Sequence, residues 1–232
     1  MLIVIAAVAI VTLLVTAFGG SDRPATLAPA AASATRLLPA GPPAQKVVAR
    51  VGALRIQLPV NESRLTAVGY FGAEDGSLAL SPVGHQANEG LLRRLLHKVV
   101  GGGGGWPRWY VLPGSHGAAL TALDVGAPSG TDVYTPVDGT VVGIGKVILN
   151  GKAYGARIDI QPLDAPSLIV SLSHLSADPS LTVGATLTAG ASKIGTVLDF
   201  SHAEHQALAR FTNDSGNHVL IEVHPSATLQ AR

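Results

Sequence analysis

The side chains that could do chemistry in this chain are histidines and carboxylates. The sequence contains 8 histidines and 15 acidic residues but no cysteine. The lack of cysteine excludes disulfides, thiol catalysis and cysteine-based zinc sites. Any metal site must therefore use histidine and carboxylate ligands. Asp124 is the first carboxylate of interest, because it lies directly before a turn-rich stretch.

The elements that must position these side chains are short β-strands. In residues 124–145, Pro128-Ser129-Gly130 supplies a chain reversal, because proline fixes φ and glycine tolerates a positive φ. Asp138-Gly139 is a strong hairpin signal, and β-branched residues 140–142 follow it. This close spacing of turn residues predicts an antiparallel β core of short strands.

Further strands are predicted on both sides of this stretch. Residues 54–58 alternate between apolar and polar, as in a half-buried strand, and residues 65–71 and 77–80 could pair around a turn at 74–76. Two helices interrupt the strands: residues 88–100, with a basic and an apolar face, and residues 202–211, after a capping box. The other predicted strands are residues 47–51, 147–149, 156–160, 167–175, 181–184, 187–190, 194–197 and 217–223.

Three motifs occur in a recognisable order: A-P-S-G-T-D-V-Y-T-P-V-D-G-T-V-V at 127–142, H-L-S at 174–176 and H-V-L-I-E-V at 218–223. Through them, residues 115–224 resemble the lysostaphin-type (LytM-like) zinc metallopeptidases, whose site combines H-x-x-x-D, an H-L-S step and H-L-H-F-E-V. The resemblance implies the mainly β fold of that family, an antiparallel sheet or sandwich core (duplicated hybrid motif). It also implies a relationship to endopeptidases that act on the peptide part of bacterial peptidoglycan.

The resemblance carries over only part of the family's site. In the family, zinc is held by the His and Asp of H-x-x-x-D and by the second His of H-x-H. Asp124 matches that aspartate, whereas Leu120 and Leu220 stand at the two histidine positions. His174 and His218 match two further histidines of the family, which are not zinc ligands. The resemblance implies that these two are catalytic positions.

This loss bears directly on catalysis. A catalytic zinc needs three protein ligands and one open position for water. Without the metal, no water is acidified towards neutral pH and no carbonyl is polarised. Residues 218 and 220 share one face of a strand, so Leu220 puts a branched apolar side chain into the metal position.

Other histidines are candidates to restore the ligand set. His116 lies eight residues before Asp124, and His202 and His205 share one face of the predicted helix. The alternative for all three is an ordinary surface histidine. We therefore expect no cofactor, with zinc only if one of these residues rescues the site.

The organisation predicted for the chain has four parts. Residues 1–18 carry no charged side chain and would span roughly 27 Å as a helix, so residues 1–19 are expected to be a transmembrane anchor or a signal peptide. Residues 20–45 are an Ala/Pro-rich linker. A small α+β segment (46–114) ends in a glycine-rich hinge, and the peptidase-like β domain covers 115–232.

The leading hypothesis is an extracytoplasmic pseudoenzyme, anchored or secreted, that binds peptidoglycan or a cell-wall hydrolase. Asp124, His174 and His218 would line its groove. One alternative is an active zinc endopeptidase with a rearranged ligand set, and another is a purely structural envelope protein. The balance of 16 basic and 15 acidic residues gives no reason to expect nucleic acid.

Overall fold

The computed structural model describes residues 40–73, 76–88, 106–113, 119–149, 151–200 and 206–229. The chain divides into two compact units, Met1–Leu38 and Pro39–Arg232, and the description concerns the second. The expected N-terminal anchor, most of the linker, the helix at 88–100 beyond its first residue, and the hinge lie outside the described residues. In the described ranges, no helix is long and apolar enough to cross a membrane.

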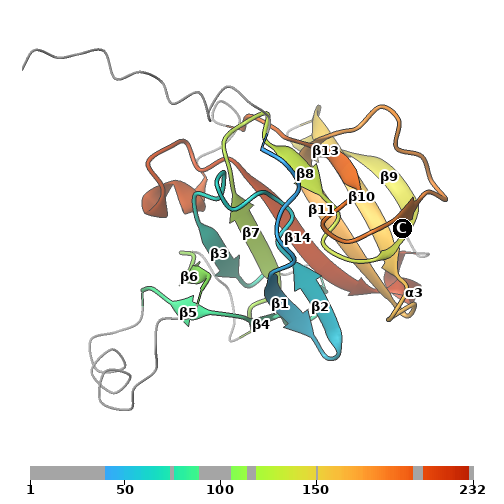
Figure 1. Ribbon diagram of the computed structural model, residues 1–232, viewed down its shortest axis with the longest axis horizontal. Helices are drawn as coiled ribbons and strands as arrows, with labels where there is room; N and C mark the ends of the chain where they lie inside the picture. The colour runs from blue at the N-terminus through green and yellow to red at the C-terminus, as the bar shows by residue number, and fades with distance from the viewer. Residues whose placement is uncertain are drawn as a thin grey trace, which may run out of the picture. The chain divides into compact units, whose positions relative to one another are not determined.

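The described part of the chain is mainly β, as the sequence predicts (Figure 1). A large sheet has the strand order β12-β9-β10-β11-β14-β7-β3-β6-β5, with β13 and β8 attached beside β11. Its strands are β3 (Val68–Phe71), β5 (His85–Gln86), β6 (Arg108–Val111), β7 (Ala122–Gly126), β8 (Asp132–Tyr134), β9 (Gly139–Leu149), β10 (Lys152–Pro162), β11 (Leu168–Ala177), β12 (Thr186–Leu187), β13 (Lys193–Val197) and β14 (His218–Pro225).

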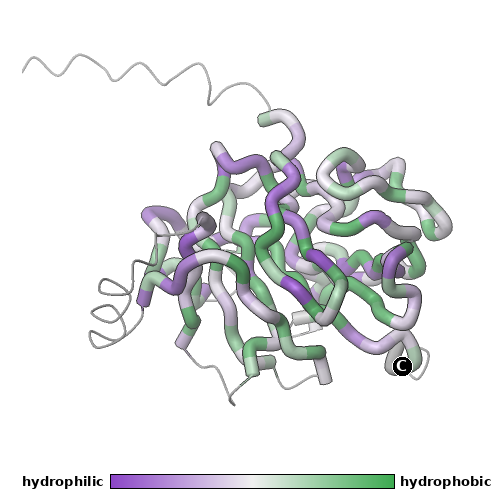
Figure 2. Tube along the Cα trace, turned by 60° about the horizontal axis from the view of Figure 1, so that its bottom comes forward, coloured by the Kyte–Doolittle hydropathy of each residue, from purple (hydrophilic) through white to green (hydrophobic). Residues whose placement is uncertain are grey.

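A second, smaller sheet has the order β2-β1-β4 and is formed by β1 (Val47–Val51), β2 (Leu54–Gln57) and β4 (Ser81–Pro82). Hydrophobic and hydrophilic residues are intermixed along the described chain (Figure 2). Two short helical turns complete the described elements, the 3₁₀ helix η2 (Ala207–Phe211) and the α-helix α3 (Ser226–Leu229).

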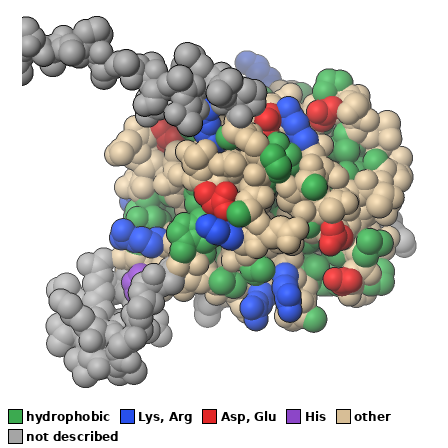
Figure 3. All heavy atoms as spheres, in the orientation of Figure 1, with side chains coloured by type: hydrophobic (Ala, Val, Ile, Leu, Met, Phe, Trp, Pro, Cys, Tyr) green, Lys and Arg blue, Asp and Glu red, His purple; other side chains and the backbone are tan. Residues whose placement is uncertain are grey.

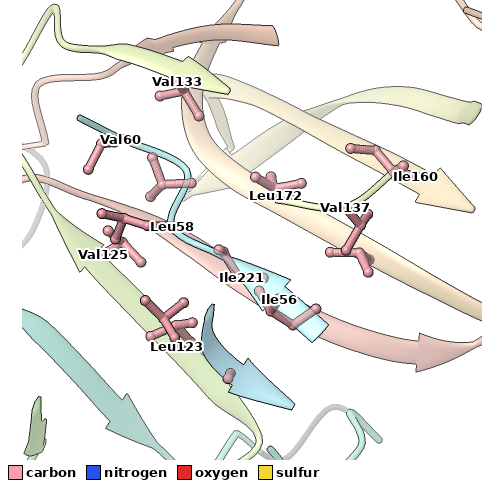
Figure 4. Packing of buried hydrophobic residues seen from close by; sticks show 14 of the residues in the cluster. Ile56, Leu58, Val60, Leu123, Val125, Val133, Val137, Ile160, Leu172 and Ile221 are labelled. Atoms are coloured by element: carbon pink, nitrogen blue, oxygen red, sulfur yellow. The ribbon is translucent and has the colours of Figure 1, made fainter. Parts of the chain in front are cut away.

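One hydrophobic core joins the two sheets. Figure 4 shows Ile56 and Leu58, at the end of the small sheet, among side chains of the large sheet such as Leu123 and Ile221. All four of these side chains are fully buried. Strands from residues 46–114 and from the C-terminal region thus share the same core.

Strand alternation separates the core from the opposite face of the sheet. On β14, Val219, Ile221 and Val223 are fully buried in the core. Residues 218, 220 and 222 must then point to the other face, because successive side chains of a strand alternate. The candidate site lies on that face.

Several local predictions differ from the structure. Residues 181–184 form no strand, and of residues 187–190 only Leu187 lies in a strand, β12. Residues 77–80 do not pair with β3, because β3 lies between β6 and β7. Asp138-Gly139 does not close a hairpin, because β8 pairs with β13 while β9 pairs with β10 and β12. Glycine is needed at 139 for another reason: a Cβ atom there would lie 2.5 Å from the carbonyl oxygen of Gln161.

The helix predicted over 202–211 is also different where the structure describes it. Residues 207–211 form the 3₁₀ helix η2 rather than an α-helix. Its N-terminal neighbour Gln206 makes no side-chain capping bond. Residues 201–205, including the expected capping box, lie outside the described residues.

A buried hydrogen bond between the two sheets gives a first testable prediction. The Tyr70 hydroxyl donates to the Val48 carbonyl at 2.6 Å, and both side chains are fully buried. Tyr70→Phe removes this hydrogen bond, while the Val48 carbonyl keeps the one that it accepts from the Val83 N–H at 2.9 Å. The variant should lower the free energy of unfolding by about 1 kcal/mol in urea denaturation. Tyr134→Phe is the matched control, because no hydrogen bond from the Tyr134 hydroxyl to a described residue is present. Equal stability of the two variants would contradict this role for Tyr70.

Candidate functional site

Asp124 lies in the middle of β7, on the face opposite the core. Its antiparallel neighbours are Gly69 on β3 and Leu220 on β14. The side chain is almost fully buried, and its Oδ1 atom accepts no hydrogen bond from the described residues. Burial raises the pKa of Asp124 to about 6; His218 opposes this shift and Glu222 adds to it. Asp124 is therefore a carboxyl group that titrates near neutral pH.

His218 enters the same site from the start of β14. Its Nε2 atom lies 3.4 Å from Oδ1 of Asp124 and 2.9 Å from Nδ1 of His174. Its Nδ1 atom lies 2.9 Å from the carbonyl oxygen of Gly216. A carbonyl can only accept, so Nδ1 of His218 carries the proton and donates it. Nε2 of His218 is then the atom that faces both His174 and Asp124.

His174 completes the pair from a bulge in β11. Ala156 and Ile158 of β10 face Leu175 and Leu172, so β11 carries one extra residue at this point. His174 has a φ of 63°, which is rare for a residue other than glycine. The bulge turns the imidazole towards His218 and against the ring of Phe200, 4.4 Å away between ring centres.

The environment of His174 keeps its ring neutral. Burial, followed by the neighbouring His218, lowers the pKa of His174 to about 3. When His218 is neutral, neutral His174 donates from Nδ1 to Nε2 of His218, which leaves Nε2 of His174 as an acceptor. Together the two rings form an oriented hydrogen-bonding pair rather than a pair of cations.

The two leucines at the family's ligand positions have different surroundings. Leu220 is half-buried and lies directly opposite Asp124 on one side and Ser173 on the other. Directly opposed residues have Cβ atoms about 5 Å apart, so the Leu220 side chain lies beside the Asp124 carboxyl group. Leu120 precedes β7 and packs against the main core.

The donor set does not fit a zinc ion in the part of the chain that the structure describes. No three His, Asp or Glu side chains there are arranged to hold a metal. Asp124, His174 and His218 are brought together, but His218 Nε2 contacts both of the others instead of sharing a common centre with them. His116, His202 and His205 lie outside the described residues.

A polar network next to these residues was not recognised in the sequence. The guanidinium of Arg157 donates from Nε to Asp159 at 2.8 Å and from an Nη2 atom to Ser171 at 2.9 Å. Ser171 in turn donates to Asp159 at 2.6 Å. The alternation Arg157-Ile158-Asp159-Ile160 could have revealed it, because it places both charged side chains on the face opposite the core.

Cross-strand register connects this network with the candidate site. Ser171 faces Glu222 across β11 and β14, and Leu220 of the next row faces Asp124. The face opposite the core thus carries polar groups from β7 across β14 and β11 to β10. The Arg157 side chain is 24% exposed, so a ligand on this face can reach it.

Comparison with known proteins finds similarity to solved structures only. No family model and no curated protein matches the chain. The chain is similar to lysostaphin in its NMR solution structure, with 19% identity, a TM-score of 0.33, and coverage of 45% of this chain and 36% of that chain. It is also similar to pseudoalterin, an M23 metalloprotease from the deep sea, with 14% identity, a TM-score of 0.39, and coverage of 75% and 72%.

A third similar structure is Csd3 from Helicobacter pylori, with 16% identity, a TM-score of 0.38, and coverage of 77% of this chain and 32% of that chain. The chain therefore spans about a third of the length of lysostaphin and of Csd3. At these identities and TM-scores, neither an activity nor a substrate follows from the matches.

The buried carboxyl group gives a pH-dependent prediction. The folded-state pKa of Asp124, about 6, lies above the value of 3.8 for a free aspartate. The folded chain therefore holds this proton more tightly, and the stability it contributes is present below pH 3.8 and is lost as the pH rises through 6. Asp124→Asn removes this loss and should be more stable than wild type at pH 8, by up to about 3 kcal/mol.

The measurement is urea denaturation of both proteins between pH 4 and pH 8. We expect the advantage of Asp124→Asn to be constant above about pH 7 and to shrink as the pH falls through 6 towards 4. Asp164→Asn, which removes an exposed carboxylate after β10, serves as the control. A stability difference between Asp124→Asn and wild type that stays constant with pH would contradict the assignment.

Proposed function

We propose that this chain is a cell-envelope protein whose lysostaphin-type, peptidase-like domain binds the peptide part of peptidoglycan without hydrolysing it. The observation that carries the proposal is the cross-strand register that puts Leu220 beside Asp124. An apolar side chain then stands where the family has a zinc-ligating histidine. The neighbouring histidine pair is retained with an ordered hydrogen-bond geometry.

The remaining groups are suited to binding. A single carboxylate does not hold zinc at useful affinity, so no activated water is available for hydrolysis. His174 is neutral and keeps Nε2 as an acceptor for an amide N–H of a ligand. A histidine pair held by a backbone carbonyl is pre-organised, which lowers the entropic cost of binding.

Arg157 supports a peptide ligand that carries a carboxylate. Its guanidinium has five N–H groups, and the contacts to Asp159 and Ser171 use only two nitrogen atoms. These contacts also fix its orientation, so little side-chain entropy is lost when a ligand binds. Peptidoglycan peptides offer both amide groups and carboxylates, which suits the histidine pair and the arginine.

The near-balanced charge gives no reason to expect a strongly charged partner such as nucleic acid. On the face seen in Figure 3, Lys and Arg side chains lie interspersed with Asp and Glu side chains and uncharged surface. We place the domain outside the cytoplasm, with residues 1–18 as its membrane anchor. A cell-wall hydrolase is the alternative ligand of the same face.

Cosedimentation with insoluble peptidoglycan tests the proposal. Wild-type full chain should be retained, and His174→Ala and Arg157→Ala should each weaken retention about tenfold, as expected for the loss of an oriented or charged hydrogen bond. Leu163→Lys is the control, because Leu163 is 62% exposed on the turn after β10. If the wild type is not retained, the peptidoglycan-binding proposal is contradicted.

The same incubation also tests the enzymatic alternative. The supernatant should contain no newly released peptides or free amino groups, with or without added zinc. Zinc-dependent release that is lost in Asp124→Ala would show an active endopeptidase whose ligands include one of His116, His202 or His205. A pull-down with cell-wall hydrolases tests the other partner. If the wild type binds neither peptidoglycan nor a hydrolase, only the structural alternative is left.

A further inference from the structure

A hollow lies beside β2 of the small sheet, where that strand meets the loops at the start of β9 and at the end of β10. This β2 hollow has a volume of about 430 Å³. Sites for small ligands typically have volumes of about 300–1,000 Å³. One wall comes from β2 and the residue before it, and the other comes from residues 137–138 and from residues 162 and 164. None of these residues belongs to the candidate site around Asp124.

The β2 hollow opens at the end of a short antiparallel contact along the outer edge of β2. The Tyr134 N–H donates to the Pro59 carbonyl at 2.7 Å, and the Gln57 N–H donates to the Pro136 carbonyl at 2.9 Å. These two bonds define a register, in which two residues along one segment match two residues along the other. The next pair in this register lies at the hollow.

Arg55 and Asp138 are that next pair, but the two segments move apart there. No backbone hydrogen bond joins them, and the Asp138 carbonyl accepts instead from the Leu163 N–H at 3.0 Å. Arg55 lies two residues before Gln57, so its N–H and C=O point to the same side as those of Gln57, away from β1. Among the described strands, none pairs with β2 on that side. The hollow therefore borders an unused backbone donor and acceptor.

Opposite charges line the two walls of the β2 hollow. Within the described ranges, neither the Arg55 guanidinium nor the Asp164 carboxylate has a hydrogen bond or an ion pair. Asp138 accepts from the Ala189 N–H through Oδ1 at 2.8 Å, which leaves Oδ2 for another donor. Because the opposite charges do not pair with each other, a ligand that carries both charges can enter between them.

Arg50 adds to the need for an anion beside Arg55. The two arginines lie directly opposite each other on β1 and β2, and both are exposed. Directly opposed residues have Cβ atoms about 5 Å apart, and like charges in such a pair are destabilising. Arg50 has no ion pair with any residue that the structure describes. A carboxylate bound at Arg55 offsets this repulsion.

The floor of the β2 hollow is apolar and belongs to the hydrophobic core. Leu54 and Val137 are 6% and 3% exposed, and Figure 4 shows Val137 among the core side chains. Pro162 is also buried. The floor is therefore rigid and suits a small apolar side chain. A preformed site of this kind loses little entropy when a ligand binds.

We propose that the β2 hollow binds a short zwitterionic peptide in an extended conformation. The peptide carboxylate pairs with Arg55, and its ammonium group pairs with Asp138 and Asp164. Its main chain bonds the N–H and C=O of Arg55, as when a strand is added to the edge of a sheet. A simple anion such as phosphate fits less well, because two carboxylates line the same hollow. The proposal does not depend on the function of the face around Asp124, since the two sites share no residue.

Trialanine with free ends is the probe, and its N-acetylated and C-amidated forms each lack one charge. Exposed ion pairs contribute little, so the expected affinity is weak, with a Kd of about 1 mM. A ligand-observed NMR titration with the full chain in detergent suits this range. Trialanine should bind to the wild type, and each blocked form should bind about fivefold more weakly.

Charge variants assign the two ends of the peptide. Arg55→Gln should weaken binding of trialanine about fivefold and leave binding of the C-amidated form unchanged. The double variant Asp138→Asn/Asp164→Asn should weaken binding of trialanine by a similar factor and leave binding of the N-acetylated form unchanged. All three side chains are exposed, so these variants are expected to fold. Arg108→Gln, which removes an exposed guanidinium on β6, is the control and should change nothing.

Three results would overturn the proposal. The first is that the wild type does not bind trialanine, and the second is that it binds the blocked forms equally well. The third is that Arg157→Ala loses binding whereas Arg55→Gln keeps it, because the peptide would then bind on the face around Asp124.

Discussion

The antiparallel register between β7 and β14 is the constraint on which the candidate site depends. It pairs Asp124 with Leu220 and sets His218 one row further along the same face. A slip of one residue would turn Asp124 into the core and Val125 out of it. The buried residues on the core side, such as Leu123, Val125 and Ile221, hold this register, because each would be exposed in any other. The hydrophobic core thus determines which polar groups meet on the opposite face.

Desolvation then determines what those groups can do. The same burial raises the pKa of Asp124 and lowers that of His174, so both are biased towards their neutral forms. The neutral His174 ring, hydrogen-bonded to His218, can recognise a ligand by its hydrogen-bond pattern rather than by charge. The charged contribution comes from Arg157, which is balanced by Asp159 and stays partly exposed. Leu220 provides the apolar contact between these polar parts.

Much of the fold could be predicted because strand alternation and turn residues act locally. The predicted strands near 47–51, 54–58, 156–160 and 217–223 all occur, as does the mainly β class. Pairing depends on distant partners: Asp138-Gly139 has the local chemistry of a hairpin, yet β8 finds β13 instead. The meeting of Asp124, His174 and His218 followed from the family resemblance. The bulge and positive φ at His174 have no sequence signal, because glycine or asparagine would be expected there. The sequence indicated the Arg157 network only through the apolar–polar alternation of residues 156–160.

We propose that the Leu220 side chain replaces a zinc ligand and leaves a binding site without metal. Elemental analysis of the purified full chain, after incubation with zinc and exhaustive dialysis, tests this most directly. We expect far less than one zinc per chain, with the same low value for Asp124→Ala. One zinc per chain in the wild type, lost in Asp124→Ala, would contradict it.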